Sequence, residues 1–321
     1  MVYSPLAYLS APWPRQIHGF DVAINVLGYM PYGFLCVAAL YPRPRGALAF
    51  AIAVLSAAAL SVSLETAQNY LPTRIASTVD VLSNIAGAAL GAAAGLRFTP
   101  WLLEHGPFQR LRGTAFLPGT GVDFGLALIA LWLFIQLNPT TLLFGAGDLR
   151  DLVVNPAGRV RGPAFFAQIE AVTAAANLLA LALLMSALAA PRQPLRAMLA
   201  VLVAGALVVK SMAFALTRDS AFIWLTPGAQ EGLVAGFAIA LAAVALPRTA
   251  RLVLAAVLIM AATVLVNLAP PNPYFTDTLR VWRQGHFLNF NGLTRLVSAA
   301  WPFIALGYLI FLASRRREQE R

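Results

Sequence analysis

Seven polar side chains lie within or beside apolar stretches between residues 21 and 84, and they are the clearest candidates for chemistry in this chain: Asp21, Asn25, Glu65, Gln68, Arg74, Asp80 and Asn84. An ionisable group at the centre of a membrane helix costs at least ~2.5–3.5 kcal/mol, so such residues usually mark a site. Carboxylates can hold a hard cation or act as general acid and base, and an arginine can bind an anion.

The spacing of these residues places them together. Three pairs are three or four residues apart and therefore share a helix face: Asp21 with Asn25, Glu65 with Gln68, and Asp80 with Asn84. If the first and third helices enter the membrane from outside and the second returns, all three pairs lie at the outer side. Arg74 falls in the short connection between the second and third helices. The seven residues are therefore expected to converge on one outward-facing polar pocket.

Composition sets the class of protein. Hydrophobic residues make up 60% of the chain and charged residues 11%, which excludes an ordinary soluble globular domain. Nine apolar stretches have the length needed to cross a ~30 Å hydrocarbon core: 22–41, 47–67, 79–97, 122–143, 166–190, 195–215, 229–246, 250–268 and 293–313. The sequence therefore predicts an all-α, polytopic transmembrane helical bundle with about nine spans.

The charge of the chain indicates its orientation rather than a nucleic-acid partner. The net charge is +10, but the 23 Lys and Arg residues are scattered through connections instead of covering one soluble face. With the N-terminus outside, 13 arginines fall in cytoplasmic segments and nine in outer ones, so the positive-inside rule places the C-terminus in the cytoplasm. The single cysteine, Cys36, excludes an intramolecular disulfide.

The third stretch also carries Gly87, Gly91 and Gly95, a doubled GxxxG pattern. Small residues at this spacing let two helix backbones approach closely. One interpretation is that a neighbouring helix packs here and holds Asp80 and Asn84 in place, and the other is ordinary bundle packing.

The order and spacing of these motifs over about residues 20–97 resemble the VanZ-like family. The matching segments are Asp21-Val-Ala-Ile-Asn25, Pro31-Tyr-Gly33-Phe, Glu65-Thr-Ala-Gln68, Pro72-Thr-Arg74 and Asp80-Val-Leu-Ser-Asn84-Ile-Ala-Gly87. The resemblance implies a multi-pass protein of the bacterial inner membrane and cell envelope, whose recurring polar positions are the seven residues above. The founding member of the family is associated with low-level resistance to the glycopeptide teicoplanin, and the family has no generally established biochemical activity.

Two expectations about domain organisation follow. Residues 1–97 form a VanZ-like domain with three spans, and residues 98–321 form an additional six-span region. Similar proteins usually have a hydrophobic helix before the aspartate, which residues 1–20 are too short and proline-rich to supply. Either the start codon is misplaced or this branch lacks that helix.

The second region offers secondary candidates for a site: Glu170, Lys210, Arg218 and Glu231. A shift of 144 residues places Arg218 on Arg74 and brings Lys210 within one residue of Glu65, which is either a degenerate parallel repeat or a chance match of apolar helices. Lys210 either extends its head group to the interface, pairs with Glu170 or Glu231, or faces an anionic ligand.

Several functions stay open at this point. The leading hypothesis is a pocket that binds an anionic lipid headgroup, a lipid-linked envelope precursor or a glycopeptide, and the alternatives are a transporter or lipid flippase and an intramembrane enzyme with a carboxylate base. No Ser/His/Asp arrangement, P-loop or HExxH motif is present, which favours a protein that is not an enzyme. No cofactor is expected, although Asp21, Glu65 and Asp80 could ligate a divalent cation. The polar residues could also serve only as contacts between helices.

Overall fold

The computed structural model describes residues 6–10, 12–13, 19–68, 70, 76–150, 161–215, 221–270, 272 and 288–319. The chain divides into two compact units, Met1–Arg112 (unit 1) and Gly113–Arg321 (unit 2). Across the described residues the elements are helices, without a strand, and seven helices are long and apolar enough to cross a membrane. The predicted all-α, polytopic fold class is confirmed.

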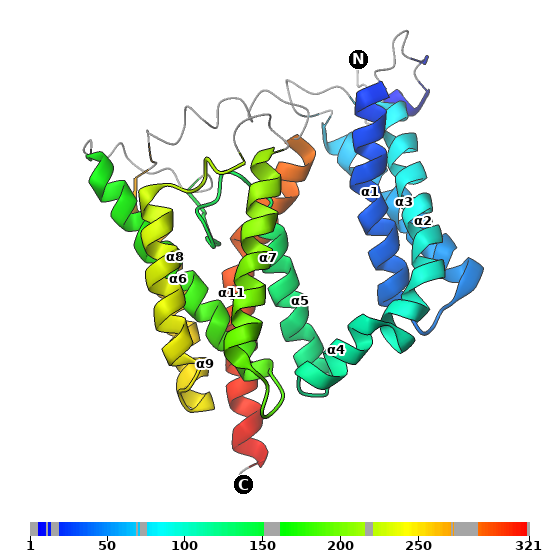
Figure 1. Cartoon of the computed structure of the whole chain (residues 1–321). Helices are drawn as coiled ribbons and strands as arrows, with labels where there is room; N and C mark the ends of the chain where they lie inside the picture. Colours follow the sequence, from blue (N-terminus) through cyan, green and yellow to red (C-terminus); the bar gives the residue numbers. More distant parts are fainter. Residues whose placement is uncertain are drawn as a thin grey trace. The chain divides into compact units, whose positions relative to one another are not determined.

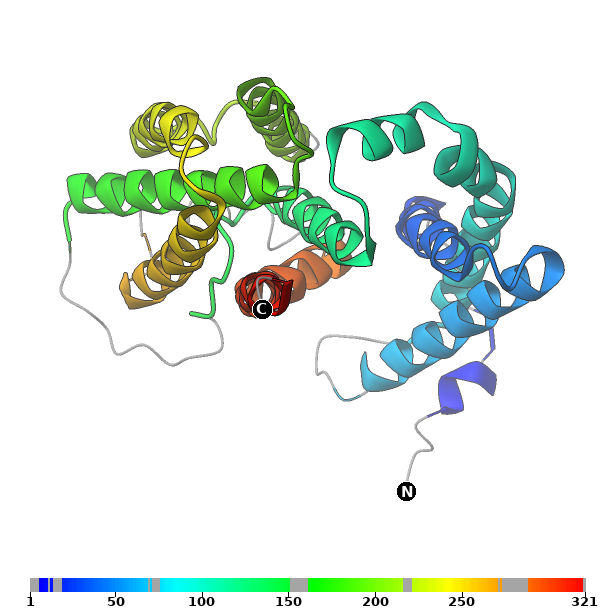
Figure 2. The ribbon, with the colours of Figure 1, turned by 90° about the horizontal axis from the view of Figure 1, so that it is seen from below.

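Unit 1 is built on three helices that stand side by side in Figures 1 and 2: α1 (Gly19–Leu40), α2 (Gly46–Gln68) and α3 (Thr78–Pro100). A short 3-10 helix, η1 (Ala7–Ser10), precedes them, and a π-helical turn (Trp101–His105) and α4 (Pro107–Ala115) follow. The start of α1, the end of α2 and the start of α3 lie together, and we call this the polar end of unit 1. Predicted helix bounds in this unit agree with the structure within three residues.

The glycines of α3 allow it to lie directly on the backbone of α1. A Cβ atom added to Gly87 would stand 2.2 Å from the carbonyl oxygen of Val26, and one added to Gly91 would stand 1.9 Å from that of Met30. Both distances are far inside van der Waals contact, so any side chain at these positions would force the helices apart. The close approach that the GxxxG pattern predicts is therefore confirmed, and the two helices run parallel.

A stripe of small residues on α2 faces the other two helices. The residues repeat every four positions and are all buried: Ala49, Ala53, Ala57, Ser61 and Glu65. A spacing of four keeps them on one face of the helix. The last two members are polar and lie at the polar end, so the packing of α2 carries Ser61 and Glu65 into the interior.

The described residues of unit 2 form the helices α5 (Thr120–Ile135), α6 (Pro163–Leu188), α7 (Leu195–Ala215), α8 (Pro227–Ala243), α9 (Arg248–Leu268) and α11 (Leu288–Gln319). The helix α6 lies between α8 and α9, which pack on different sides of it (Figure 2). Its last twelve residues, 177–188, are all buried, so α6 forms the centre of the unit.

The glycine packing of unit 1 recurs inside unit 2. Gly228 and Gly232 of α8 lie against the carbonyl oxygens of Ala167 and Ala171 of α6, with Cβ positions 2.4 and 2.6 Å away. Each of these glycines lies 61 positions later in the sequence than the residue it contacts, and the same spacing separates Gly87 from Val26. The glycine contacts of α6 and α8 therefore correspond to those of α1 and α3 with a shift of 141 residues, three fewer than the shift of 144 on which the possible repeat was based.

The span predicted over 122–143 ends early. The helix α5 stops at Ile135, and residues 136–150 continue as a non-helical segment that we call the inner loop. Most of the inner loop is buried, including Gln136, Asn138 and Phe144. Non-helical backbone is tolerated at membrane depth only where protein or an aqueous cavity satisfies its polar groups. The backbone polar groups of this segment therefore need partners inside the protein.

Buried side chains satisfy the backbone of the inner loop. The Lys210 ammonium group is 1% exposed and donates to the carbonyl oxygens of Asn138 at 2.8 Å and Thr141 at 2.7 Å, and to the Thr141 hydroxyl at 3.1 Å. Gln136 accepts from the Phe144 amide at 3.1 Å, and Asn267 donates to the Gly147 carbonyl at 2.6 Å. The prediction that Lys210 extends to the interface is wrong, because its head group caps a buried turn.

The inner loop ends on an ion pair. Arg150 Nη2 lies 2.6 Å from Asp148 Oδ2, and Nη1 donates to the carbonyl oxygens of Ala269 and Pro270 beyond α9. Burial raises the pKa of the Asp148 carboxyl, but the hydrogen bonds and charge of Arg150 outweigh burial and hold the pKa below its ordinary value of 3.8.

This pair predicts a loss of stability in acid. A carboxyl whose pKa is lower in the folded state stabilises the protein above its unfolded pKa, and that contribution disappears as the pH falls through the folded value. We expect the melting temperature of the wild type to fall more steeply below about pH 3.8 than that of Asp148→Asn, with the two slopes equal near neutrality. Equal slopes throughout the acid range would contradict the assignment, and Glu231→Gln, on an exposed part of α8, is the control.

Candidate functional site

Two of the predicted residues meet across the α1–α3 contact. Asn25 Nδ2 donates to Asp80 Oδ1 at 2.8 Å. Val26, the next residue on α1, is the one that lies against Gly87, so the close approach of the backbones brings Asn25 within reach of Asp80. The hydrogen bond to a carboxylate fixes the relative position of the two helices at the polar end.

A third predicted residue links α3 to α2. Asn84 is 6% exposed, and its Nδ2 donates to the Ser61 hydroxyl at 2.9 Å. Its Oδ1 atom is buried and accepts no hydrogen bond from any residue that the structure describes. A buried acceptor without a donor costs about 1–3 kcal/mol, so this atom offers a place for the N–H or O–H of a ligand or water.

The carboxyl group of Glu65 reaches the start of α3. It is 4% exposed, and Oε2 accepts from the backbone amide of Ser77 at 3.2 Å. The segment before α1 covers the same place, since the Tyr8 hydroxyl donates to the Val62 carbonyl at 3.2 Å and the Thr78 hydroxyl donates to the Tyr8 carbonyl at 2.7 Å. The polar end is thus closed on one side by η1.

The structure brings together Asn25, Glu65, Asp80 and Asn84, but it does not place all seven predicted residues in one contact network. Gln68, the last residue of α2, makes no hydrogen bond with the described residues. Asp21 lies on the first turn of α1, half-buried. Arg74 lies outside the described residues.

The site is formed of amides, hydroxyls and carboxyls. Among the described residues, no three His, Cys, Asp or Glu side chains are close enough together to hold a metal ion. Asp21, Glu65 and Asp80 therefore do not form a three-carboxylate cluster. The arrangement is suited to hydrogen bonding with a polar ligand, with both donors and acceptors available.

The described secondary candidates of unit 2 do not contact one another. Glu170 Oε2 accepts from the Thr226 hydroxyl at 2.6 Å, next to the α6–α8 glycine contact, and Glu231 is exposed. Lys210 is not within ion-pair distance of either glutamate, because its three protons are directed to the inner loop. Arg218 lies outside the described residues.

Sequence reasoning missed three participants at the polar end: Ser61, Ser77 and Tyr8. A signal for Ser61 was present, because it continues the four-residue stripe from Ala57 and precedes Glu65 by one turn. Ser77 contributes its backbone amide, and Tyr8 contributes contacts over more than fifty residues of chain, for which the sequence pattern gives no signal.

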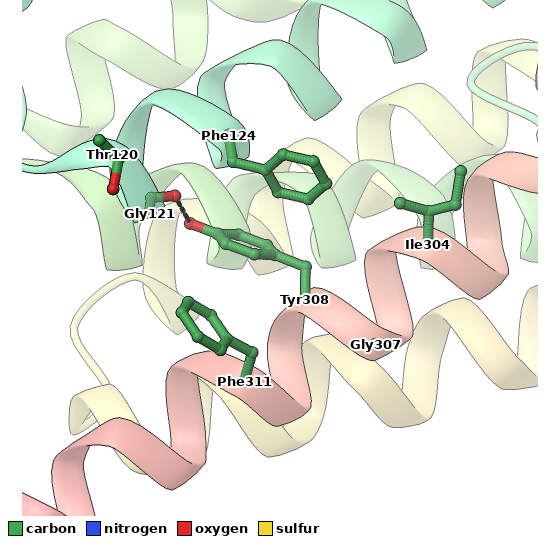
Figure 3. Close-up of a pocket in the computed structure, with 7 residues that line it drawn as sticks. All are labelled: Thr120, Gly121, Phe124, Ile304, Gly307, Tyr308 and Phe311. Carbon is green, nitrogen blue, oxygen red and sulfur yellow. Dashed lines mark hydrogen bonds between the residues drawn. The ribbon is translucent and has the colours of Figure 1, made fainter.

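An apolar groove in unit 2 is separate from these residues. It lies between the start of α5 and α11, has a volume of about 470 Å³, and is walled by Phe124, Tyr308 and Phe311 (Figure 3). The Tyr308 hydroxyl donates a hydrogen bond to the Gly121 carbonyl at 2.7 Å, within the protein. The groove therefore presents mainly aromatic carbon, which is typical of a surface that contacts acyl chains.

Comparison with known proteins agrees with the N-terminal motifs. Residues 3–99 match the family model described as VanZ/LLP1. No curated protein and no solved structure matches the chain. With seven apolar helices long enough to cross a membrane, the chain is a multi-pass membrane protein, and its N-terminal region, residues 3–99, is VanZ-like.

Proposed function

We propose that this protein resides in the bacterial inner membrane and uses the polar end of unit 1 to bind the anionic headgroup of a lipid, a lipid-linked envelope precursor or a glycopeptide. Asn84 carries the proposal, since its buried Oδ1 lacks a donor among the described residues. Asn25, Glu65 and Asp80 line the same end and orient the ligand, and Arg74 supplies the positive charge for an anionic group. The polar end faces outward and the C-terminus lies in the cytoplasm, in accord with the distribution of arginines.

The energetics support a binding role in preference to packing alone. Interhelical hydrogen bonds in membranes average about 0.6 kcal/mol, so the Asn84–Ser61 bond by itself is weak compensation for a buried amide. A residue kept only for packing would have no reason to retain an unpaired oxygen that a small or apolar side chain would remove. A ligand donor at Asn84 Oδ1 removes this cost.

The test is rescue of a deletion strain. We expect Asn84→Leu, Glu65→Gln and Arg74→Gln, at membrane abundance matched to the wild type, to fail to restore the lipid and cell-wall-precursor profile. The control is Ser83→Ala on the same helix, whose buried hydroxyl bonds only to the Val79 carbonyl of its own helix. Full rescue by all three variants would overturn the proposal and leave the polar residues as helix contacts.

A transporter or lipid flippase is a second candidate, favoured by one observation. The α1–α3 packing recurs in α6 and α8, and repeated units of this type are common in transporters. In proteoliposomes, a flippase would move a fluorescent phospholipid between leaflets at a rate that depends on Glu170, the polar residue next to the α6–α8 contact. No movement above that of protein-free vesicles would remove this candidate.

A further inference from the structure

A cavity in unit 2 lies at the end where α6 finishes and α7 and α9 begin. Its volume is about 330 Å³, and its lining includes Arg192, Arg248 and Arg251. Two backbone hydrogen bonds of 2.9 Å, from Leu117 to Leu188 and from Ala190 to Ala115, tie the chain before α5 to the end of α6 and form one wall. The cavity is half open, has one wall of hydrogen-bonded backbone and is large enough for a small anionic group.

The guanidinium groups in this cavity are only partly satisfied. Arg251 Nη1 donates to the Ser186 carbonyl at 2.8 Å, but the Nε atoms of both Arg248 and Arg251 are buried and find no acceptor among the described residues. Within the same residues, none of the three arginines forms an ion pair with a carboxylate. The charged group that acts on Arg251 is Arg248, which has the same sign. Three positive charges thus share a cavity in which no described carboxylate pairs with them.

Two further features point to an anion. The backbone of Arg192 has a φ of +65°, in the left-handed region that a side chain rarely adopts, and such strain is concentrated at functional positions. Arg248 is the first residue of α9, so the positive end of the helix dipole lies at the same cavity.

The positive-inside rule alone does not account for this geometry. Arginines that only mark the cytoplasmic side of a membrane protein need water around their head groups. Here both Arg248 and Arg251 are half-buried, and their Nε protons are removed from solvent. A buried donor without an acceptor is unfavourable, and an anion in the cavity would remove this cost.

We propose that this cavity binds a phosphate group. Phosphate presents several oxygens to the planar fork of an arginine and makes paired, charge-assisted hydrogen bonds with it. Arg248 and Arg251 would take the group through Nε and Nη donors, and Arg192 closes the site from the α6–α7 turn. The phosphate is either free in the aqueous phase or the headgroup of an anionic phospholipid, and the experiment distinguishes the two sources.

Thermal unfolding of the purified full chain tests the proposal. One arm adds inorganic phosphate in detergent at constant ionic strength, with chloride as the reference anion. The second arm compares nanodiscs of phosphatidylglycerol with nanodiscs of phosphatidylcholine. Stabilisation by phosphate assigns the site to the free anion, and stabilisation by phosphatidylglycerol alone assigns it to the lipid headgroup. No stabilisation in either arm overturns the proposal.

Variants localise the effect. We expect Arg248→Gln and Arg251→Gln each to weaken binding at least about tenfold, as the loss of a charge-assisted hydrogen bond implies. The Arg248 side chain makes no hydrogen bond with the described residues, so its replacement breaks none and the variant should fold normally. Arg196→Gln is the matched control, because Arg196 has the same charge at the start of α7 but does not line the cavity and donates to the Leu241 carbonyl. An equal loss with Arg196→Gln would contradict the site.

Discussion

Gly91→Ala is expected to destabilise unit 1 by about 3 kcal/mol or more. The new Cβ atom would stand 1.9 Å from the Met30 carbonyl oxygen, which is backbone and cannot rotate away. The two helices would have to separate along their shared length, and overpacking of this kind costs about 1–3 kcal/mol even where flexible side chains can yield. Separation would also lengthen the Asn25–Asp80 hydrogen bond, which depends on the same approach.

Gly28→Ala is the matched control for this prediction. Gly28 lies within α1, and a Cβ atom there would meet nothing within 4 Å. Alanine in a helix interior is favoured over glycine by about 0.5–1 kcal/mol, so this variant should be neutral or slightly more stable. The measurement is the free energy of unfolding of the purified chain in detergent. Similar stability of the two variants would show that α1 and α3 are not in backbone contact.

The sequence predicts the fold of unit 1 well because its packing follows regular spacing. Glycines every four residues on α3 and small residues every four on α2 indicate which faces meet, and the i, i+4 spacing of Asp80 and Asn84 places both at one end. The spacing does not predict which neighbouring helix provides the hydrogen-bond partner of each residue. Asn84 bonds to Ser61 on α2, whereas Asp80 bonds to Asn25 on α1, a difference set by the rotation of α3 between its two neighbours.

Unit 2 is predicted less well because the span predicted over 122–143 crosses residues that do not favour a helix. The chain leaves the helix at Gln136, shortly before Asn138 and Pro139, and a proline disfavours helical backbone at the residue before it. The side chains that stabilise this departure come from far along the chain, with Lys210 and Asn267 bonding to carbonyls of the inner loop. Sequence analysis identifies Lys210 as unusual but cannot find its acceptors, since two of the three are backbone carbonyls.

Replacing the buried ammonium group of Lys210 is expected to have the second large effect, on the stability of the inner loop. Lys210→Met keeps the length and apolar stem of the side chain but removes three hydrogen bonds, and it leaves the carbonyl oxygens of Asn138 and Thr141 without their donor. Each buried carbonyl without a partner costs about 1–3 kcal/mol, so we expect the inner loop to lose about 3 kcal/mol of local stability. The helices α6 and α9, which have their own contacts, should stay folded.

Hydrogen exchange measures this local opening directly. Amides of the inner loop that are bonded inside the protein, such as those of Phe144 and Gly147, should exchange about a hundredfold faster in Lys210→Met, while amides of α6 keep their protection. Val208→Ala is the control, because Val208 lies on the same helix with an exposed side chain. An unchanged exchange rate in the inner loop would mean that the Lys210 ammonium group does not stabilise this loop. A uniform increase over the whole of unit 2 would mean that Lys210 stabilises the global fold, since exchange through global unfolding affects all elements together.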